Sequence, residues 1–167
     1  MALREIVTVP DQVLRRKARK VTDFGPDLQK LIDDMVDTMR EAPGVGLAAP
    51  QVDVPMRVIV VEYGEEDEEP RLYTLVNPEI IRASTDHETG TEGCLSIPGY
   101  AGNVDRPLAV TIKGSNRRGQ PVRIKAEGWL ARIFQHEIDH LDGVLFTDRA
   151  ENVWKLEEQD QTVALAD

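Results

Sequence analysis

The sequence predicts an α+β protein in which mostly antiparallel β-sheets pack around a central helix, with a second, amphipathic helix beside them. Three patterns carry this prediction: an apolar stripe at helical spacing over residues 26–41, several short β-branched segments between turn residues, and another helical pattern over residues 129–142. A chain of 167 residues can bury a sizeable core. We expect one domain over residues 1–150 and an acidic C-terminal tail over residues 151–167.

The first third of the chain contains the clearer helical pattern. Apolar side chains recur at spacings of three and four over residues 26–41, which makes one face apolar. Pro26 suits the first helical turn, and the Pro-Gly pair at 43–44 ends the pattern. Residues 11–14 predict a short turn or helix, and the basic run 15–20 predicts a solvated surface. The apolar face consists of Leu28, Leu31, Ile32, Met35, Val36 and Met39.

The middle of the chain carries strand patterns. β-branched and aromatic residues favour strands, whereas Asn, Pro and Gly between them favour turns. The charged segment 64–70 is expected to be a surface loop, and residues 116–119 are expected to close a hairpin. The Asn-Pro pair at 77–78 is expected to separate two strands. The predicted strands span residues 57–63, 72–75, 79–84, 108–113 and 122–127.

The second helical pattern contains a His-Glu-x-x-His motif. His136 and His140 are four residues apart, so both rings lie on one helix face and can reach one metal ion. Glu137 lies beside them, where it can hold a water molecule and move its proton. Gly143 is expected to follow the end of the helix. The stripe expected to pack on the sheet consists of Leu130, Phe134, Ile138 and Leu141.

The motif leaves the third metal ligand open. One class of metalloprotease would place a histidine at position 146, but Phe146 stands there and cannot bind a metal. A downstream glutamate, Glu157 or Glu158, is one alternative. Cys94 is another, because a thiolate is a strong ligand for zinc or ferrous iron. A lone cysteine is also commonly an inert buried residue. Three protein ligands would leave one position for water.

A glycine-rich segment, residues 44–51, follows the first predicted helix. Gly44 and Gly46 predict either a tight turn or a close approach of the backbone to a ligand. A phosphate-binding loop is a poor alternative, because no Lys-Ser/Thr pair follows the glycines. Considered alone, the segment indicates no more than a turn.

Together, three segments resemble the peptide deformylase family. The family motif G-φ-G-L-A-A-x-Q matches residues 44–51, E-G-C-L-S matches residues 92–96, and Q-H-E-x-D-H matches residues 135–140. Their order matches, and the resemblance covers nearly the whole chain. Members of the family hydrolyse the N-formyl group of N-formylmethionyl nascent peptides and release formate. The alternatives are another HExxH zinc metalloprotease that uses Glu157 or Glu158 as ligand, and a deformylase-like protein that has lost catalysis.

The resemblance implies a role for each motif. The enzyme would bind one divalent metal ion, which would be Fe(II) in the native enzyme, with Zn(II) or Ni(II) as substitutes. Glu137 would exchange the proton, while the Gln51 amide and the Leu95 backbone N–H would stabilise the developing oxyanion. Glu92 and Arg106 are expected to form a buried ion pair that fixes the strand of Cys94. The implied metal ligands are Cys94, His136 and His140.

The resemblance also implies a substrate site. An apolar pocket would accept the methionine side chain, and the backbone of Val45, Gly46 and Gly99 would lie along the peptide. Many bacterial members carry an arginine at the position of Ala101, so the contact of that arginine with the peptide end is not expected here. The residues expected to border the pocket are Val45, Gly46, Trp129 and Ile133.

Composition restricts the other function classes. The formal net charge of −10 argues against specific nucleic-acid binding. No run of 18 apolar residues exists, and residues 1–5 lack a signal-peptide pattern, so we expect a cytoplasmic protein without a membrane span. One cysteine excludes an intrachain disulfide. Because the tail over residues 150–167 is acidic, any transient ribosome association is expected to use another surface, such as residues 15–20.

Overall fold

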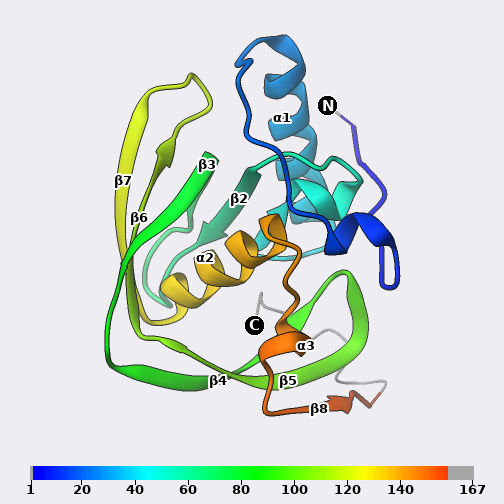
Figure 1. Cartoon of the computed structure of the whole chain (residues 1–167), viewed down its shortest axis with the longest axis vertical. Helices are drawn as coiled ribbons and strands as arrows, with labels where there is room; N and C mark the ends of the chain where they lie inside the picture. The colour runs from blue at the N-terminus through cyan, green and yellow to red at the C-terminus, as the bar shows by residue number, and fades with distance from the viewer. Residues whose placement is uncertain (1, 158–167) are drawn as a thin grey trace.

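Two antiparallel sheets surround one long helix in the computed structural model, which describes residues 2–157 (Figure 1). The helix α2, Gly128–Leu141, lies in the middle of the molecule, and α1, Pro26–Glu41, lies beside the first strands. The predicted α+β class and its two helices are therefore confirmed. Within the described residues, no helix is long and apolar enough to cross a membrane.

Five strands form the larger sheet and three form the smaller one. The larger sheet has the order β1-β2-β3-β6-β7, and the smaller sheet has the order β4-β5-β8. The strands are β1 Gly46–Ala48, β2 Val58–Tyr63, β3 Arg71–Ala83, β4 His87–Cys94, β5 Ile97–Pro107, β6 Ala109–Ser115, β7 Pro121–Glu127 and β8 Asn152–Lys155. Three short helical turns complete the fold: η1 Gln12–Arg15, η2 Ala49–Val52 and α3 Phe146–Arg149.

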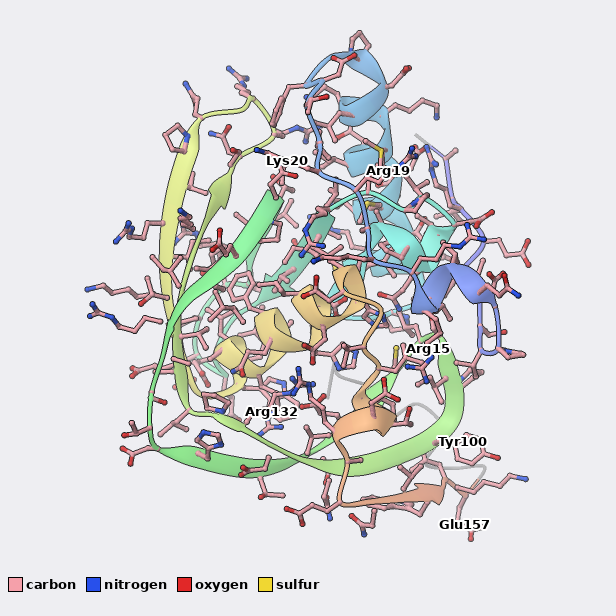
Figure 2. All side chains as sticks on the ribbon, in the orientation of Figure 1. Arg15, Arg19, Lys20, Tyr100, Arg132 and Glu157 are labelled. Atoms are coloured by element: carbon pink, nitrogen blue, oxygen red, sulfur yellow. The ribbon has the colours of Figure 1, made fainter. Side chains whose placement is uncertain are left out.

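The basic run before α1 lies on the surface, as predicted. Arg15, Arg19 and Lys20 are exposed (Figure 2), while Ala18 between them is buried. Arg15 pairs with Asp148, the third residue of α3. The run is therefore a solvated stretch of chain that one buried alanine anchors to the core.

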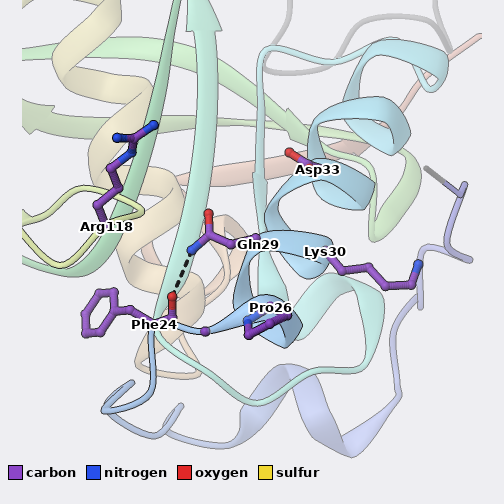
Figure 3. A pocket seen from close by; sticks show the side chains of 7 residues that line it. Phe24, Pro26, Gln29, Lys30, Asp33 and Arg118 are labelled. Atoms are coloured by element: carbon purple, nitrogen blue, oxygen red, sulfur yellow. Dashed lines mark hydrogen bonds between the residues drawn. The ribbon is translucent and has the colours of Figure 1, made fainter.

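Helix α1 has the bounds that its apolar spacing predicted. Its buried face packs in one cluster with side chains of β1 and β2. The Gln29 side chain donates a hydrogen bond to the Phe24 carbonyl (3.1 Å) in a surface groove at the start of the helix (Figure 3). The residues lining that groove include none of the predicted site residues. Helix α1 therefore packs against β1 and β2, and the groove at its start is separate from the predicted site residues.

Helix α2 is confirmed within one residue at each end. Phe134, Ile138 and Leu141 belong to a buried cluster with strands of the larger sheet, and Leu130 packs against it partly buried. Gly143 has φ +74°, which suits a residue just after a helix. A Cβ atom there would lie 2.6 Å from the Arg15 carbonyl oxygen. Glycine is therefore required at this position both by backbone conformation and by space.

The separation predicted at Asn77-Pro78 is wrong, because β3 runs through both residues. Asn77 has φ +53°, and the pairing with β6 shifts register between Val76 and Glu79. The Asn77 side chain accepts from the Val21 N–H (2.8 Å) and donates to the Val21 carbonyl (3.0 Å). A local irregularity inside one strand thus replaces the expected turn.

The hairpin of β4 and β5 was not among the predicted strands. Only the last three residues of β4 are buried, so its sequence lacks the apolar alternation that marks a strand. Part of the expected acidic tail, Asn152–Lys155, forms β8 and pairs with β5. The domain boundary at residue 150 stays a prediction, and residues 158–167 of the predicted tail lie outside the described residues.

Candidate metal centre

Three potential metal ligands converge where β4 meets α2. Their ligand atoms lie within 4.8 Å of one another, and the Cys94 Sγ is 3.4 Å from the His140 Nε2. All three side chains are buried, with exposed fractions of 7% for Cys94, 3% for His136 and 1% for His140. The final residue of a strand and two residues one helical turn apart therefore meet at one point.

Local structure explains this convergence. The imidazoles of His136 and His140 lie one above the other on α2, with ring centroids 5.1 Å apart. Cys94 ends β4 at an irregularity, because the pairing of β4 with β5 shifts register between Gly93 and Cys94. Phe146 stacks on the His136 ring at 6.2 Å. Phe146, which stands where one class of metalloprotease has its third histidine, thus packs against the proposed ligand His136.

Glu92, two residues before Cys94, is the centre of a buried ionic network. Its carboxylate accepts from the His136 Nδ1 (2.9 Å), twice from Arg106 (2.6 and 2.9 Å) and from the Arg132 Nη1 (2.7 Å). Arg106 also donates to Asp139 (2.9 Å). The predicted Glu92–Arg106 ion pair is confirmed, with 0% and 3% of these two side chains exposed.

This network sets the charge and orientation of His136. Burial opposes ionisation of Glu92, but hydrogen bonds from Arg106 and His136 outweigh it and lower the Glu92 pKa well below its usual range. An anionic Glu92 holds the proton on Nδ1 of His136, which directs Nε2 towards the candidate centre. Burial also disfavours protonated His136, yet Cys94 and Glu92 raise its pKa to about 10. Protonated His136 carries a second proton on Nε2, and a metal would compete with that proton for the nitrogen.

His140 has a different environment. Burial, together with the charges of His136 and Arg106, lowers its pKa well below the usual value. Its Nδ1 is one of two buried side-chain atoms without a hydrogen-bond partner within residues 2–157. His140 is therefore held neutral, which is the form that binds a metal.

Glu137 contributes the other buried atom without a partner, its Oε1. The side chain is 2% exposed, and burial raises its pKa to about 7, although the nearby His136 charge acts in the opposite direction. A Cβ atom on Gly46 would lie 2.5 Å from the Glu137 Oε2. The close approach predicted for the glycine-rich segment is therefore an approach of β1 to this carboxylate.

Gln51 reaches the centre from η2. The Ala48 backbone N–H donates to the Gln51 Oε1 (2.9 Å), which leaves the amide nitrogen to face the centre. The Gln51 Nε2 donates to the Ser96 Oγ (3.1 Å) and lies 3.7 Å from the Cys94 Sγ. Gln51 thus supplies a neutral, oriented donor next to the thiol.

The donor set fits one transition-metal ion. A thiolate and two imidazoles are ligands that zinc and ferrous iron accept. In the described part of the chain, these three residues are the one cluster that satisfies the distances for a shared ion. The alternative ligand Glu157 is exposed beyond β8 (Figure 2), and Glu158 lies outside the described residues. A catalytic site with an open position and a neighbouring carboxylate therefore fits this geometry.

Comparison with known proteins decides the family. The family model described as "Polypeptide deformylase" matches residues 3–155. The chain belongs to this family. A curated "Peptide deformylase" of Natranaerobius thermophilus is 52% identical over 158 residues, covering 95% of this chain and 99% of that protein. Members of the family are metal-dependent hydrolases, so the protein is an enzyme of this kind, and the metalloprotease alternative is not favoured.

Solved structures of deformylases share the fold. The crystal structure of peptide deformylase from Thermotoga maritima has a TM-score of 0.85 and 40% identity, covering 90% of this chain and 99% of that chain. A deformylase from Ehrlichia chaffeensis, solved in complex with actinonin, has a TM-score of 0.85 and 38% identity over 97% of this chain and 93% of that chain. The deformylase fold therefore extends over nearly the whole chain.

Three of the residues expected to bind substrate share one apolar cluster. Ile133 is fully buried in the cluster that also contains partly buried Val45 and Trp129. Gly46 begins β1 and contacts Glu137. Gly99 lies in β5 with φ +86°, and its carbonyl accepts from the Leu156 N–H (2.8 Å). The deformylase chain thus brings three of these side chains into one apolar cluster, while Gly99 lies on the smaller sheet.

Sequence reasoning missed several residues around the centre. Arg132 was overlooked, although a lone cation four residues before His136 on a largely apolar helix is a signal. Asp139, inside the third motif, accepts from Arg106 and from Arg149. Ser96 receives the Gln51 amide. The last contact joins residues 45 positions apart in sequence, and their sequence pattern contains no signal for it.

Proposed function

We propose that this deformylase removes the formyl group from N-formylmethionyl nascent peptides at the centre formed by Cys94, His136 and His140. The observation that carries the proposal is the buried Cys-His-His cluster beside Glu137, whose Oε1 has no partner within the described residues. Water adds to the formyl carbon, the C–N bond breaks, and the products are formate and a free amine.

The proposed cofactor is one divalent metal, Fe(II) in the native enzyme, with Zn(II) or Ni(II) as substitutes. When bound, it polarises the formyl oxygen and lowers the pKa of water towards about 7. Cys94 provides the anionic ligand, and the two histidines provide neutral ones. Because Cys94 must stay a reduced thiol to bind a metal, we place the enzyme in the reducing cytoplasm.

Glu137 acts as the proton carrier in this proposal. Its carboxylate accepts a proton from the attacking water and returns it to the leaving amine. Burial raises the Glu137 pKa to about 7, which lies near the optimum for proton transfer in both directions at neutral pH. Gly46 supports this role because it allows β1 to approach the Glu137 side chain.

Two donors would stabilise the oxyanion that develops on the formyl oxygen. Gln51 is supported by its geometry, because the Ala48 N–H fixes its amide oxygen and leaves Nε2 facing the centre. The second donor is the Leu95 backbone N–H, directly after Cys94. Fixed donors in a buried site need no reorganisation during the reaction.

The methionine side chain would enter an apolar pocket bordered by Val45, Gly46, Trp129 and Ile133. The shared cluster of Val45, Trp129 and Ile133 supports this placement. The peptide backbone would follow Val45, Gly46 and Gly99. A flexible thioether suits such a pocket.

A formate-release assay tests the proposal. The metal-loaded enzyme should release formate from formyl-Met-Ala, should leave acetyl-Met-Ala intact, and should not cleave an internal peptide bond. Cys94→Ala should lose both the metal and the activity. Cleavage of internal bonds would support the HExxH protease instead, and metal binding without either activity would indicate a protein that has lost catalysis.

We propose that any contact of this enzyme with the ribosome uses a surface other than the C-terminal tail. The segment 150–167 carries five carboxylates and one lysine, so phosphates of ribosomal RNA would repel it. The exposed basic run 15–20 is the proposed alternative. Co-sedimentation at low salt should be equal for the full chain and for a version ending at Ala150, and binding that depends on the tail would contradict this proposal.

A further inference from the structure

Arg132 is a buried arginine on α2, one helical turn before His136. It is 5% exposed and lies between α2 and the smaller sheet (Figure 2). Its Nη1 donates to the Glu92 carboxylate (2.7 Å) and to the Val104 carbonyl (2.8 Å), while its Nη2 donates to the Glu88 carbonyl (2.6 Å). One guanidinium therefore joins the helix of the two histidines to both β4 and β5.

Each oxygen of the Glu92 carboxylate has two hydrogen-bond partners. Oε1 accepts from His136 (2.9 Å) and from the Arg106 Nη2 (2.9 Å). Oε2 accepts from the Arg106 Nε (2.6 Å) and from Arg132 (2.7 Å). Arg106 comes from β5, whereas Arg132 comes from α2 itself. Arg132 therefore links the Glu92 carboxylate directly to the helix that carries His136.

We propose that Arg132 is a positioning residue for the metal centre. By holding Glu92 and the β4 backbone against α2, it keeps Cys94 at the end of β4 at the correct distance from His136 and His140. The inference rests on the proposed metal ligands and adds a residue that acts through them. Arginine suits this role because its planar group presents several donors in a fixed geometry, which lysine cannot reproduce.

Gly90 provides independent support. It lies on β4 opposite Val104, and a Cβ atom there would lie 2.9 Å from the Arg132 Cζ and 3.0 Å from its Nε. The strand therefore has no side chain at the point where the guanidinium crosses it. Gly90→Ala would displace Arg132 while leaving every charge of the network in place.

Arg117 offers a matched control at a distance. It also joins a helix to a strand connection, because it donates to the Gln29 side chain (2.7 Å), the Gln29 carbonyl (3.2 Å) and Asp33 (2.8 Å). None of these partners belongs to the metal centre. Arg117→Met thus removes a comparable three-bond arginine contact without touching Glu92.

The test measures metal binding on the full chain with Co(II) as the probe. Transfer of Co(II) to a chelator gives its affinity, and the visible absorption spectrum reports the ligand geometry. Arg132→Met should weaken Co(II) binding by roughly 10- to 100-fold, the usual cost of losing a partner that orients a ligand, and should change the spectrum. Arg132→Lys should not restore it. Gly90→Ala should weaken binding in the same direction, and Arg117→Met should leave affinity and spectrum unchanged.

Each outcome decides between the hypotheses. Wild-type affinity and spectrum in Arg132→Met overturn the inference. If that variant does not fold, wild-type affinity in Gly90→Ala overturns it instead. Adding Gly90→Ala to Arg132→Met should cause no further loss, because the contact is already absent. If the wild-type chain binds no Co(II), or if Cys94→Ala binds it equally well, the proposed metal site fails and not the role of Arg132.

Discussion

Two regions that border the candidate centre, one at the smaller sheet and one at the start of the larger sheet, are held by different means. On the side of the smaller sheet, Cys94 follows a strand that buried charges fix, with Glu92 between Arg106 and Arg132. On the side of the larger sheet, Gly46 and Gln51 lie in short elements that are fully or almost fully buried among apolar residues, β1 and η2. One side is fixed by ion pairs, and the other by apolar packing together with the hydrogen bond from the Ala48 N–H to Gln51.

This difference corresponds to the two proposed tasks of the centre. Metal ligands need defined directions, and hydrogen bonds to Glu92 give His136 a direction. The carboxylate of Glu137 needs freedom to accept and return a proton, and its Oε1 has no partner within residues 2–157. The charged side is therefore assigned to hold the metal, and the apolar side to position the carboxylate and the substrate.

The largest expected effect is on the proton carrier. Glu137→Gln should retain the metal but lose turnover by at least the ~10²–10⁴ that general acid–base catalysis supplies. Metal content and formate release measured on one sample check both statements. A metal-loaded variant with near-normal kcat would remove Glu137 from the mechanism, and loss of the metal would mean that the two sides do not divide these tasks.

The charged side should be the more sensitive in stability. Arg106→Ala leaves the buried Glu92 and the nearby Asp139 without their shared partner, and breaking such a pair costs ~3–5 kcal/mol of unfolding free energy. Arg149→Ala removes a 48% exposed partner of the same Asp139 and should cost only ~0–1 kcal/mol. Urea unfolding of both variants measures the contrast, and equal costs would argue against a buried network.

The apolar side should respond to added volume. Gly46→Ala places a Cβ 2.5 Å from the Glu137 Oε2, and overpacking of this kind costs ~1–3 kcal/mol. We expect slower turnover with unchanged metal content, because the displaced group is the carboxylate. Gly44→Ala is the control, since the closest atom to its Cβ would be the flexible end of the Leu95 side chain at 3.0 Å. Equal turnover in the two variants would show that β1 does not position Glu137.

Asp34 on α1 is a buried charge outside the candidate centre, so its effect on stability can be compared with that of the charges around Glu92. Burial would raise the Asp34 pKa, but hydrogen bonds from Lys30, the Ala2 backbone and Arg4 outweigh it and lower the pKa to about 2. A lowered carboxyl pKa stabilises the fold above the unfolded value of about 3.9, and this contribution disappears as pH falls towards 2.

Asp34→Asn should therefore reduce the free energy of unfolding at pH 6, and the difference from wild type should shrink below about pH 4. Unfolding by urea at decreasing pH, down to the lowest value at which both proteins are folded, gives this difference. A constant difference would show that Asp34 does not act through its charge.

How much the sequence revealed depended on the kind of interaction. The apolar spacing of α1 predicted its bounds, and the motif on α2 located His136, Glu137 and His140 on one helix. The hairpin of β4 and β5 was missed because only the last three residues of β4 are buried, so its sequence lacks apolar alternation, and the pairing with β5 is not displayed by a sequence pattern.

The network around the centre was only partly predictable. The resemblance indicated Glu92 and Arg106, but the role of Arg132 depends on contacts with residues 28 to 44 positions away. Gly46 was expected to approach a ligand or form a turn, and its actual neighbour is Glu137. Contacts of this kind depend on how sheets and helix pack together, which periodicity within one segment does not determine.

The most direct test of this account is X-ray absorption at the metal edge of the zinc-loaded protein. The account predicts one sulfur ligand at about 2.3 Å and two histidine nitrogens at about 2.0–2.1 Å, with one further light atom. The sulfur contribution should disappear in Cys94→Ala. A first shell of nitrogen and oxygen alone in the wild-type protein would contradict the assignment of Cys94 and, with it, the division of the centre between the two sheets.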